Sequence, residues 1–311
     1  MNKNIPYHLF ICVILLLLCG CTAKPTIDFK NLHTYSSELD ESFHKKLDPP
    51  YAAYFKTKNG AFLYVANRHE VGLETSTFQF RKDILDAFSP DIVILEGFEE
   101  KEGLSPIRIT QHIQKYCLPK WNCCSENLYA AHLASQKKIK FIGAEPSDSE
   151  IFELLALQNY ALKDVVFFYF VRSLPQYVME NIIKSADDVI AAFKQFISQY
   201  MDAGSYSYDD YEAWFQEKVG KLSIIDESTT APIETGHYLQ KLSSRINAIR
   251  DQHILKVIFQ NIESHKKVVV AFGASHYPLQ KDVLEQYLGR ATYFRTAEDL
   301  KNHFAANESK Q

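Results

Sequence analysis

Four short apolar runs constrain the fold of this 311-residue chain more than any other feature. They cover residues 61–66, 91–95, 139–144 and 267–272, and each is rich in β-branched or aromatic side chains. Runs of this length and composition are typical of strands that are covered on both faces of a sheet. We therefore expect four buried strands.

Helical patterns separate these runs and extend beyond them. Residues 77–88 and 126–137 have helical periodicity, and strands that alternate with helices favour right-handed crossovers and parallel pairing. A long segment, about 149–264, has helical periodicity and few strand signals, and the tail adds a strand at 291–294 and a helix at 297–304. The sequence predicts an α/β fold: a mostly parallel central sheet flanked by helices, with a large helical insertion.

Composition excludes one class of partner. The chain is 46% hydrophobic, which is enough for a sizeable core, and its net charge is −4. Lysine and arginine form no basic stripe, so we expect no nucleic-acid binding.

The N-terminus resembles a lipoprotein signal. Lys3 precedes an apolar run at 9–18, which suits a signal peptide and is too short to span a bilayer. The run ends in Leu18-Cys19-Gly20-Cys21, which resembles the lipobox of bacterial lipoproteins. The resemblance implies removal of residues 1–20 and lipidation of Cys21, and Thr22 after it implies the outer membrane, facing the periplasm. An ordinary secretory signal is the alternative.

After the signal we expect a tether at residues 21–50, which is polar and ends in two prolines, and then a single domain at 51–305. The mature domain has three further cysteines, Cys117, Cys123 and Cys124. In an oxidising compartment, a disulfide from Cys117 to either of the other two is expected. The spacing does not match a zinc knuckle.

Polar side chains follow all four predicted strands. His69, Glu96, Glu145 and His276 come after the first, second, third and fourth strand. Ligands bind at the carboxyl ends of parallel strands, and imidazoles with carboxylates suit Mn, Co, Zn or Fe. These residues are therefore candidate metal ligands. Each taken alone also fits a structural role at a strand end, and Glu145 could cap the helix that follows.

Common catalytic motifs are absent from the sequence. His69-Glu70 does not belong to a zincin motif, because position 73 is Leu73. Ser275 is not in a Gly-x-Ser-x-Gly nucleophile elbow. No Walker A or Rossmann glycine pattern occurs.

The same strand ends resemble the TraB/Tiki group, whose wider relatives include erythromycin esterases and ChaN haem-binding lipoproteins. That group has two Gly-x-x-His turns and a strand that ends in glutamate. Residues 273–276 match the second turn in full, residues 66–69 match the first with Ala66 in place of glycine, and Glu96 lies between them. The family also has an arginine on the helix before the last strand, where this chain has Arg250. A surface ion pair is the alternative for Arg250.

The resemblance implies a metal-dependent hydrolase that acts on a peptide or small molecule. His69, Glu96 and His276 would form its core, either by holding a divalent metal, with Glu145 as a further ligand, or by activating water directly. Arg250 would stabilise negative charge that develops on the substrate. Glu96 or Glu70 would be the general base, and Glu74 is a secondary candidate.

Two other functions remain open. A haem-binding lipoprotein would use a tyrosine or histidine ligand, and the candidates are Tyr206, Tyr208, Tyr211 and Tyr277. The second alternative is a scaffold that kept the fold and lost the catalytic activity. Ala66, which replaces the glycine of the first turn, supports it. Residues 205–216 combine aromatic and acidic side chains, which suits a recognition lid over the strand ends. The alternative is a solvated helix start whose rings pack locally.

Overall fold

The computed structural model describes residues 27–70, 73–100, 106–117, 125–179, 181–202, 205–220 and 227–308. The signal sequence and Cys21 lie outside these ranges. Within them, none of the helices has the length and hydropathy needed to cross a membrane.

A six-stranded mixed sheet forms the centre of the fold, in the spatial order β4-β3-β5-β2-β1-β6. Its strands are β1 (Tyr51–Lys56), β2 (Ala61–Asn67), β3 (Ile92–Glu99), β4 (Lys140–Glu145), β5 (Lys267–Gly273) and β6 (Thr292–Phe294). The β2–β5, β3–β5 and β3–β4 pairs are parallel, whereas β1 runs antiparallel to both β2 and β6. The predicted fold class is confirmed.

The four predicted apolar runs are the four parallel strands β2, β3, β4 and β5. Every residue of β2 is buried, and so are all residues of β5 after Lys267. Such burial requires helices on both faces of the sheet.

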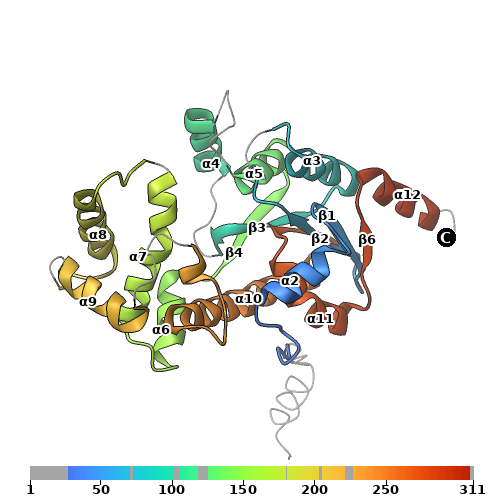
Figure 1. Ribbon diagram of the computed structural model, residues 1–311. Helices are drawn as coiled ribbons and strands as arrows, with labels where there is room; N and C mark the ends of the chain where they lie inside the picture. Colours follow the sequence, from blue (N-terminus) through green and yellow to red (C-terminus); the bar gives the residue numbers. More distant parts are fainter. Residues whose placement is uncertain are drawn as a thin grey trace, which may run out of the picture.

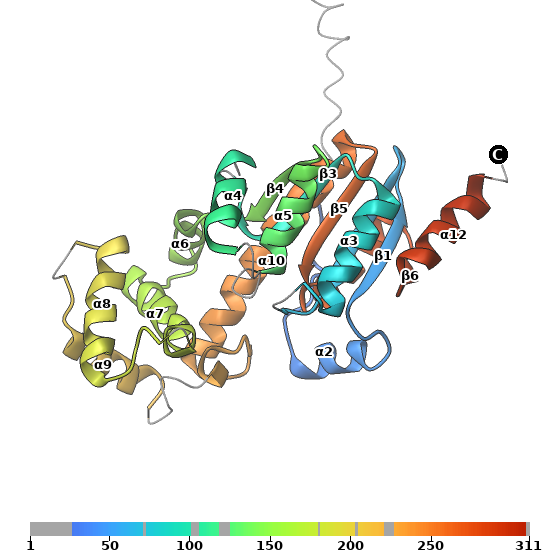
Figure 2. The same cartoon turned by 90° about the horizontal axis from the view of Figure 1, so that it is seen from above.

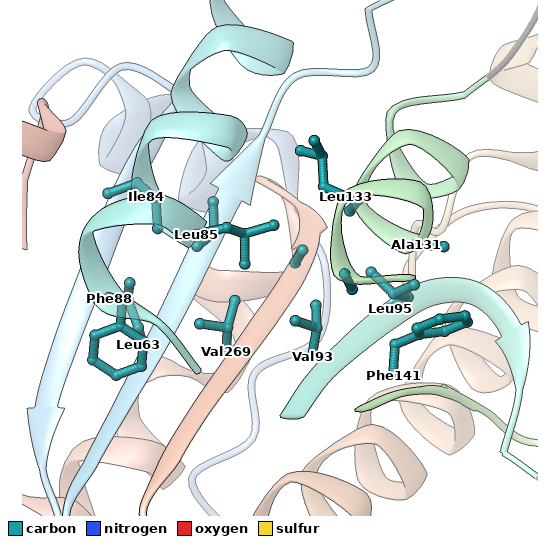
Figure 3. Close-up of a cluster of buried hydrophobic side chains, with 14 of the residues drawn as sticks. Leu63, Ile84, Leu85, Phe88, Val93, Leu95, Ala131, Leu133, Phe141 and Val269 are labelled. Carbon is teal, nitrogen blue, oxygen red and sulfur yellow. The ribbon is translucent and has the colours of Figure 1, made fainter. Parts of the chain in front are cut away.

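One face is covered by α3 (Ser76–Phe88), α5 (Glu126–Gln136) and α12 (Ala297–Glu308). Figure 3 shows Ile84, Leu85 and Phe88 of α3 directed at the strands, beside Leu133 of α5. α3 stops at Ser89, which has a φ of +50° and breaks the helical backbone. Each large apolar side chain buried here contributes about 1.5–3 kcal/mol.

The opposite face is covered by α10 (Tyr238–Ser264) and α11 (His276–Leu288), seen below the sheet in Figure 1. Residues 27–50, which we expected to be a tether, also pack here. Phe29 and Phe43 contact this core, and α2 (Ser37–His44) begins after the N-cap Ser36. The tether prediction is therefore wrong for residues 27–50, because their apolar side chains had a core to cover.

The helical insertion forms a third core beside the sheet (Figures 1 and 2). It contains α6 (Asp148–Ala156), α7 (Leu162–Met179), α8 (Ala186–Tyr200), α9 (Tyr208–Lys218), η2 (Glu227–Thr230) and the first half of α10. α10 belongs to two cores, since Leu242 packs in the insertion and Leu255 packs behind the sheet. The insertion and the sheet therefore share one continuous helix.

The aromatic segment at 205–216 packs into the insertion instead of facing a ligand. Tyr211 is 1% exposed and Trp214 is 3% exposed, and the indole N–H of Trp214 donates to Asp164 Oδ1 at 2.8 Å. Ser207 is the N-cap of α9. Asp209 and Asp210 lie in the first turn of this helix, where negative charge is favourable. The lid interpretation is therefore wrong for Tyr211 and Trp214, and the alternative is confirmed, because their rings pack into the core of the insertion.

Cys117 ends a short helical pair, α4 (Pro106–His112) and η1 (Ile113–Cys117), beside α5. It is buried and forms a disulfide. Cys123 and Cys124 lie outside the described residues, so the choice between them stays a prediction.

Candidate active site

Three parallel strands bring the predicted residues to one edge of the sheet. β5 lies between β3 and β2, with Leu95 opposite Ala271 and Asn67 opposite Gly273. The segments that follow these strands carry Glu96, His69 and His276. The structure therefore gathers the three side chains at one place, as expected from strand ends alone.

His276 lies between two carboxylates at the start of α11. Its Nε2 is 3.3 Å from Glu96 Oε1, and its Nδ1 is 2.8 Å from Asp251 Oδ1. Gln280 also donates to Asp251 Oδ1, at 2.6 Å. The other oxygen of Glu96 accepts a 2.6 Å hydrogen bond from the N–H of Gly273. Both nitrogens of His276 and both oxygens of Glu96 are therefore occupied.

These contacts fix the charges of the pair. Burial disfavours the charge of Glu96, but the hydrogen bond from His276 and the charges of His276 and Arg250 hold the pKa of Glu96 well below its usual range. Burial opposes protonation of His276 as well, yet Asp251 and Glu96 raise its pKa to about 10. Near neutral pH the pair is an imidazolium and a carboxylate, so Glu96 is a poor proton acceptor.

His69 is accessible to solvent, unlike the buried His276, because its side chain is 67% exposed. Its Nδ1 lies 2.8 Å from Oε1 of Glu126, which is 4% exposed. This hydrogen bond is the main cause that raises the pKa of His69; the charge of Glu96 adds to it, whereas burial and His276 oppose it. His69 thus combines access to solvent with a basic imidazole.

A glycine keeps His69 close to Glu96. A methyl group on Gly273 would lie 2.8 Å from Nε2 of His69 and 3.3 Å from Oε2 of Glu96. The free nitrogen of His69 and the Glu96 carboxylate therefore lie against the same point of the backbone. Only glycine leaves room for both groups there.

A cavity of about 690 Å³ opens beside His69. This volume falls within the usual range of small-molecule sites. Its lining combines charged and apolar side chains: His69, Glu96, Phe98, Ile109, His112, Ser125, Glu126, Asn127 and Leu128, together with Gly97.

Arg250 and Glu145 form a separate ion pair at the end of β4. Nε and Nη2 of Arg250 donate to the two oxygens of Glu145 at 2.8 and 2.7 Å. Burial opposes the charge of each group, but each partner stabilises the other, so the pKa of Arg250 is raised and that of Glu145 is lowered. The structure therefore turns Glu145 toward Arg250 instead of toward the two histidines.

The two secondary candidates lie outside this arrangement. Glu70 accepts a hydrogen bond from the backbone N–H of Thr77 at 3.0 Å, in the first turn of α3. Its role there is that of a helix cap. Glu74 is exposed. The expectation that Glu70 is a general base is not supported by this geometry, because its carboxylate is directed at the helix.

Glu126 and Asp251 were missed as functional candidates. Glu126 follows the N-cap Ser125 of α5, where an acidic residue has an ordinary reason to occur. Asp251 lies within a long helix and is 1% exposed. No local signal distinguishes Glu126, whereas an aspartate next to Arg250 on a buried helical face could have pointed to Asp251.

Arg81 of α3 was missed as well. It is 1% exposed; its Nε donates to Oδ1 of Asn67 at 3.0 Å, and its Nη1 donates to the backbone oxygen of Glu126. Asn67 in turn donates to the backbone oxygen of Phe272 at 3.0 Å. Arg81 therefore connects the ends of β2 and β5 to the residue that holds His69.

The donor set fits a divalent metal only in part. Each imidazole is held through Nδ1 by a carboxylate, as in many metal sites. However, a ligand must lose its proton, and His276 lies between Asp251 and Glu96 with its pKa raised to about 10. Within the described ranges, no three His, Cys, Asp or Glu side chains are arranged to hold an ion. As these side chains lie, they do not fit a three-ligand metal centre.

The tyrosines considered as haem ligands pack into cores. Tyr277 is fully buried, and its hydroxyl lies 3.1 Å from that of Tyr293. The rings of Tyr208 and Tyr211 pack against Phe193 in the insertion. Tyr206 packs on Phe167. These contacts do not favour the haem alternative.

The alanine at position 66, where the family has glycine, does not disturb the turn that leads to His69. It lies within β2, opposite Phe272, and is fully buried. The turn follows Asn67, whose backbone oxygen accepts from the N–H of Ala274 at 2.8 Å. An alanine at position 66 is therefore compatible with the observed position of His69.

The chain matches no protein-family model, no curated protein and no solved structure.

Proposed function

We propose that this protein is a hydrolase of esters or amides in which His69 is the general base. The observation that carries this proposal is the position of His69, whose Nδ1 is held by buried Glu126 and whose side chain lines a cavity of about 690 Å³. A raised pKa makes this imidazole a better proton acceptor than Glu96 near neutral pH. The TraB/Tiki resemblance agrees with hydrolysis.

In this mechanism a water molecule beside Nε2 of His69 attacks the carbonyl carbon of the substrate. Its proton passes to Nε2, and the resulting imidazolium is stabilised by Glu126 through Nδ1. When the bond to the leaving group breaks, Nε2 returns the proton to that group. Glu126 acts by fixing the tautomer of His69, as the buried aspartate does in a serine-protease triad.

Glu96 and His276 support this step without accepting the proton. Glu96 stays ionised beside the attacking water and can accept a hydrogen bond from it. The imidazolium of His276 and the guanidinium of Arg250 supply positive charge that offsets the carboxylates around the site. Arg250 acts at a distance, because its Nε and Nη2 are bound to Glu145.

Of the two mechanisms that the resemblance implies, we propose direct activation of water. His276 is flanked by Asp251 and Glu96, so a metal would have to displace its proton. A divalent ion would therefore bind with release of protons and rearrangement of Glu96.

Hydrolysis of 4-nitrophenyl butyrate by the purified protein tests the proposal. We expect the variant His69→Asn to lose about 10²- to 10⁴-fold in kcat, the usual contribution of a general base. Arg68→Gln is the matched control, since Arg68 is the preceding residue and pairs with Asp48 outside the site. Activity of wild type should survive treatment with EDTA and 1,10-phenanthroline.

Two outcomes would overturn this proposal. Equal activity of wild type and His69→Asn would remove His69 from the reaction. Loss of activity on chelation, with recovery on addition of Mn²⁺, Co²⁺, Zn²⁺ or Fe²⁺, would replace direct activation by the metal mechanism.

We further propose that Cys21 anchors the protein in a bacterial membrane, facing the periplasm. The support is the lipobox-like sequence that precedes it. In a Gram-negative host, Cys21→Ser should abolish incorporation of radiolabelled palmitate and move the protein out of the membrane fraction. A mature protein that begins elsewhere with an unmodified N-terminus would contradict the anchor.

A further inference from the structure

The cavity beside His69 has an apolar wall, which consists of Phe98, Ile109 and Leu128. Ile109 is 6% exposed and belongs to the core between the sheet, α3 and α5. Phe98 and Leu128 are half-buried and pack against the same core. The apolar wall is therefore the surface of a hydrophobic core that opens into a cavity. An apolar group that covered this surface would leave water, which is favourable.

Three separate elements bring the apolar wall to the proposed site. Phe98 lies in β3, two residues after Glu96, and Leu128 lies in α5, two residues after Glu126. Ile109 lies in α4, which packs beside α5 (Figure 1). The segments that carry the two carboxylates of the site thus also supply two residues of the wall. A substrate placed beside these carboxylates is consequently in reach of the wall.

The charges of the cavity do not suit an anion. Its carboxylates are Glu96 and Glu126, and among the described residues that line it there is no lysine or arginine. Glu96 is already bound to Gly273 and His276. Glu126 is already bound to His69. A carboxylate or phosphate against the apolar wall would lose water without gaining a lysine or arginine partner, which is unfavourable.

The volume of about 690 Å³ suits a small organic group, and sites of this size combine an apolar lining with a few polar groups that fix the orientation of the ligand. Here the polar groups are those of the proposed reaction. The remaining lining is left to bind the part of the substrate that does not react.

We propose that the cavity binds the acyl part of the substrate, a neutral apolar chain of medium length, against Phe98, Ile109 and Leu128. This inference rests on the proposed hydrolase function and adds the substrate class. It also gives α4 a task, because this helix supplies a residue that selects the chain.

Esters that differ only in the acyl chain test the substrate class. 4-Nitrophenyl acetate, butyrate and hexanoate share one leaving group, and mono-4-nitrophenyl adipate ends its chain in a carboxylate. We expect kcat/KM of wild type to rise about fourfold for each added methylene, the usual gain when that group is buried. The adipate ester should be at least about tenfold poorer than the hexanoate ester.

Ile109→Phe is the decisive variant, because the larger ring occupies the space of the chain. It should lower kcat/KM at least about tenfold for the hexanoate ester, the loss of roughly two buried methylenes, and less than about twofold for the acetate ester. Ile107→Phe is the matched control, since Ile107 belongs to the same helix but is 69% exposed and lies outside the cavity lining.

Leu128→Phe narrows the cavity from α5 and should have the same effect as Ile109→Phe. Thermal unfolding shows whether each variant is folded, so the inference can be tested with either one. A wild type with equal kcat/KM for acetate and hexanoate, or with a preference for the adipate ester, would overturn it. Equal effects of the folded cavity variants on the short and the long ester would do so as well.

Ligand-observed NMR with 2-heptanone separates this inference from the hydrolase proposal. This ketone has the hexanoyl chain without a leaving group, and 6-oxoheptanoate is its anionic counterpart. If wild type hydrolyses none of the esters, the hydrolase proposal fails, and binding alone decides the role of the cavity. Binding of 2-heptanone that exceeds that of 6-oxoheptanoate, and that is lost in Ile109→Phe but kept in Ile107→Phe, supports the acyl site. Equal binding to both variants, equal or stronger binding of the anion, or no binding to wild type overturns it.

Discussion

His69 owes its proposed role to a residue 57 positions away along the chain. Histidine has an ordinary pKa near neutrality, and the Glu126 hydrogen bond raises the pKa of His69 above that value. His276 is only 8% exposed and is held as an imidazolium by Asp251 and Glu96. The same side-chain type therefore occurs in two different environments beside one carboxylate, one exposed to solvent and one buried.

Replacing Glu126 by glutamine should change the pH dependence of activity. The carboxylate of Glu126 is the largest cause that raises the pKa of His69 from 6.5. Its loss lowers that pKa, so the acidic limb of kcat/KM should move to lower pH. The activity on the plateau should also fall, because glutamine does not fix the tautomer of His69. The loss can reach roughly 10²- to 10⁴-fold, the usual contribution of a general base.

The pH profile of 4-nitrophenyl ester hydrolysis measures both effects, and thermal unfolding shows whether the variant is folded. An acidic limb that stays in place in Glu126→Gln, or moves to higher pH, would show that His69 is not the group that titrates.

At the scale of single elements, two glycines at the strand ends have opposite functions. A methyl group on Gly273 would contact the ring of His69, at the end of an exposed side chain that can turn away. A methyl group on Gly143 of β4 would lie 2.1 Å from the backbone oxygen of Phe98 in the neighbouring strand. One contact involves the proposed catalytic group, and the other involves the sheet itself.

We therefore expect Gly273→Ala to fold normally and to lose at least about tenfold in kcat/KM through displacement of the base. Gly143→Ala should be destabilised by about 3 kcal/mol or more, because two strands must separate. Chemical denaturation and ester hydrolysis, measured on both variants, distinguish the two effects. A Gly273→Ala protein with full activity would contradict the close approach of His69 to the backbone.

The strands and their polar ends could be predicted because each signal is local. A short apolar run followed by His69 or Glu96 can be recognised without knowledge of its neighbours. β1 was missed because it is a short antiparallel strand directly after the Pro49-Pro50 pair. Glu126 could not be found, because its contact with His69 depends on how α5 and β2 are placed in space.

At the scale of the whole molecule, α10 unites the sheet and the insertion. Leu242 and Leu255 are both fully buried, but they belong to different cores. We expect Leu242→Ala and Leu255→Ala each to lower the free energy of unfolding by about 2–5 kcal/mol. Because one helix connects the two cores, both variants should shift the same single transition.

Urea denaturation followed by circular dichroism and by tryptophan fluorescence tests this cooperativity. In a Trp121→Phe background, Trp214 reports on the insertion, since it is buried among the aromatic side chains there. Two separate transitions, with Leu242→Ala affecting only the fluorescence, would show that the insertion unfolds independently.

The continuity of α10 also limits how the chain can change in length. The helix has 27 residues, and one inserted residue turns everything before it by about 100° relative to everything after it. An extra residue between Leu242 and Arg250 would therefore rotate the helical insertion relative to the strand ends. Related chains should vary in length in the loops of the insertion and keep the residue count of α10 constant up to Arg250.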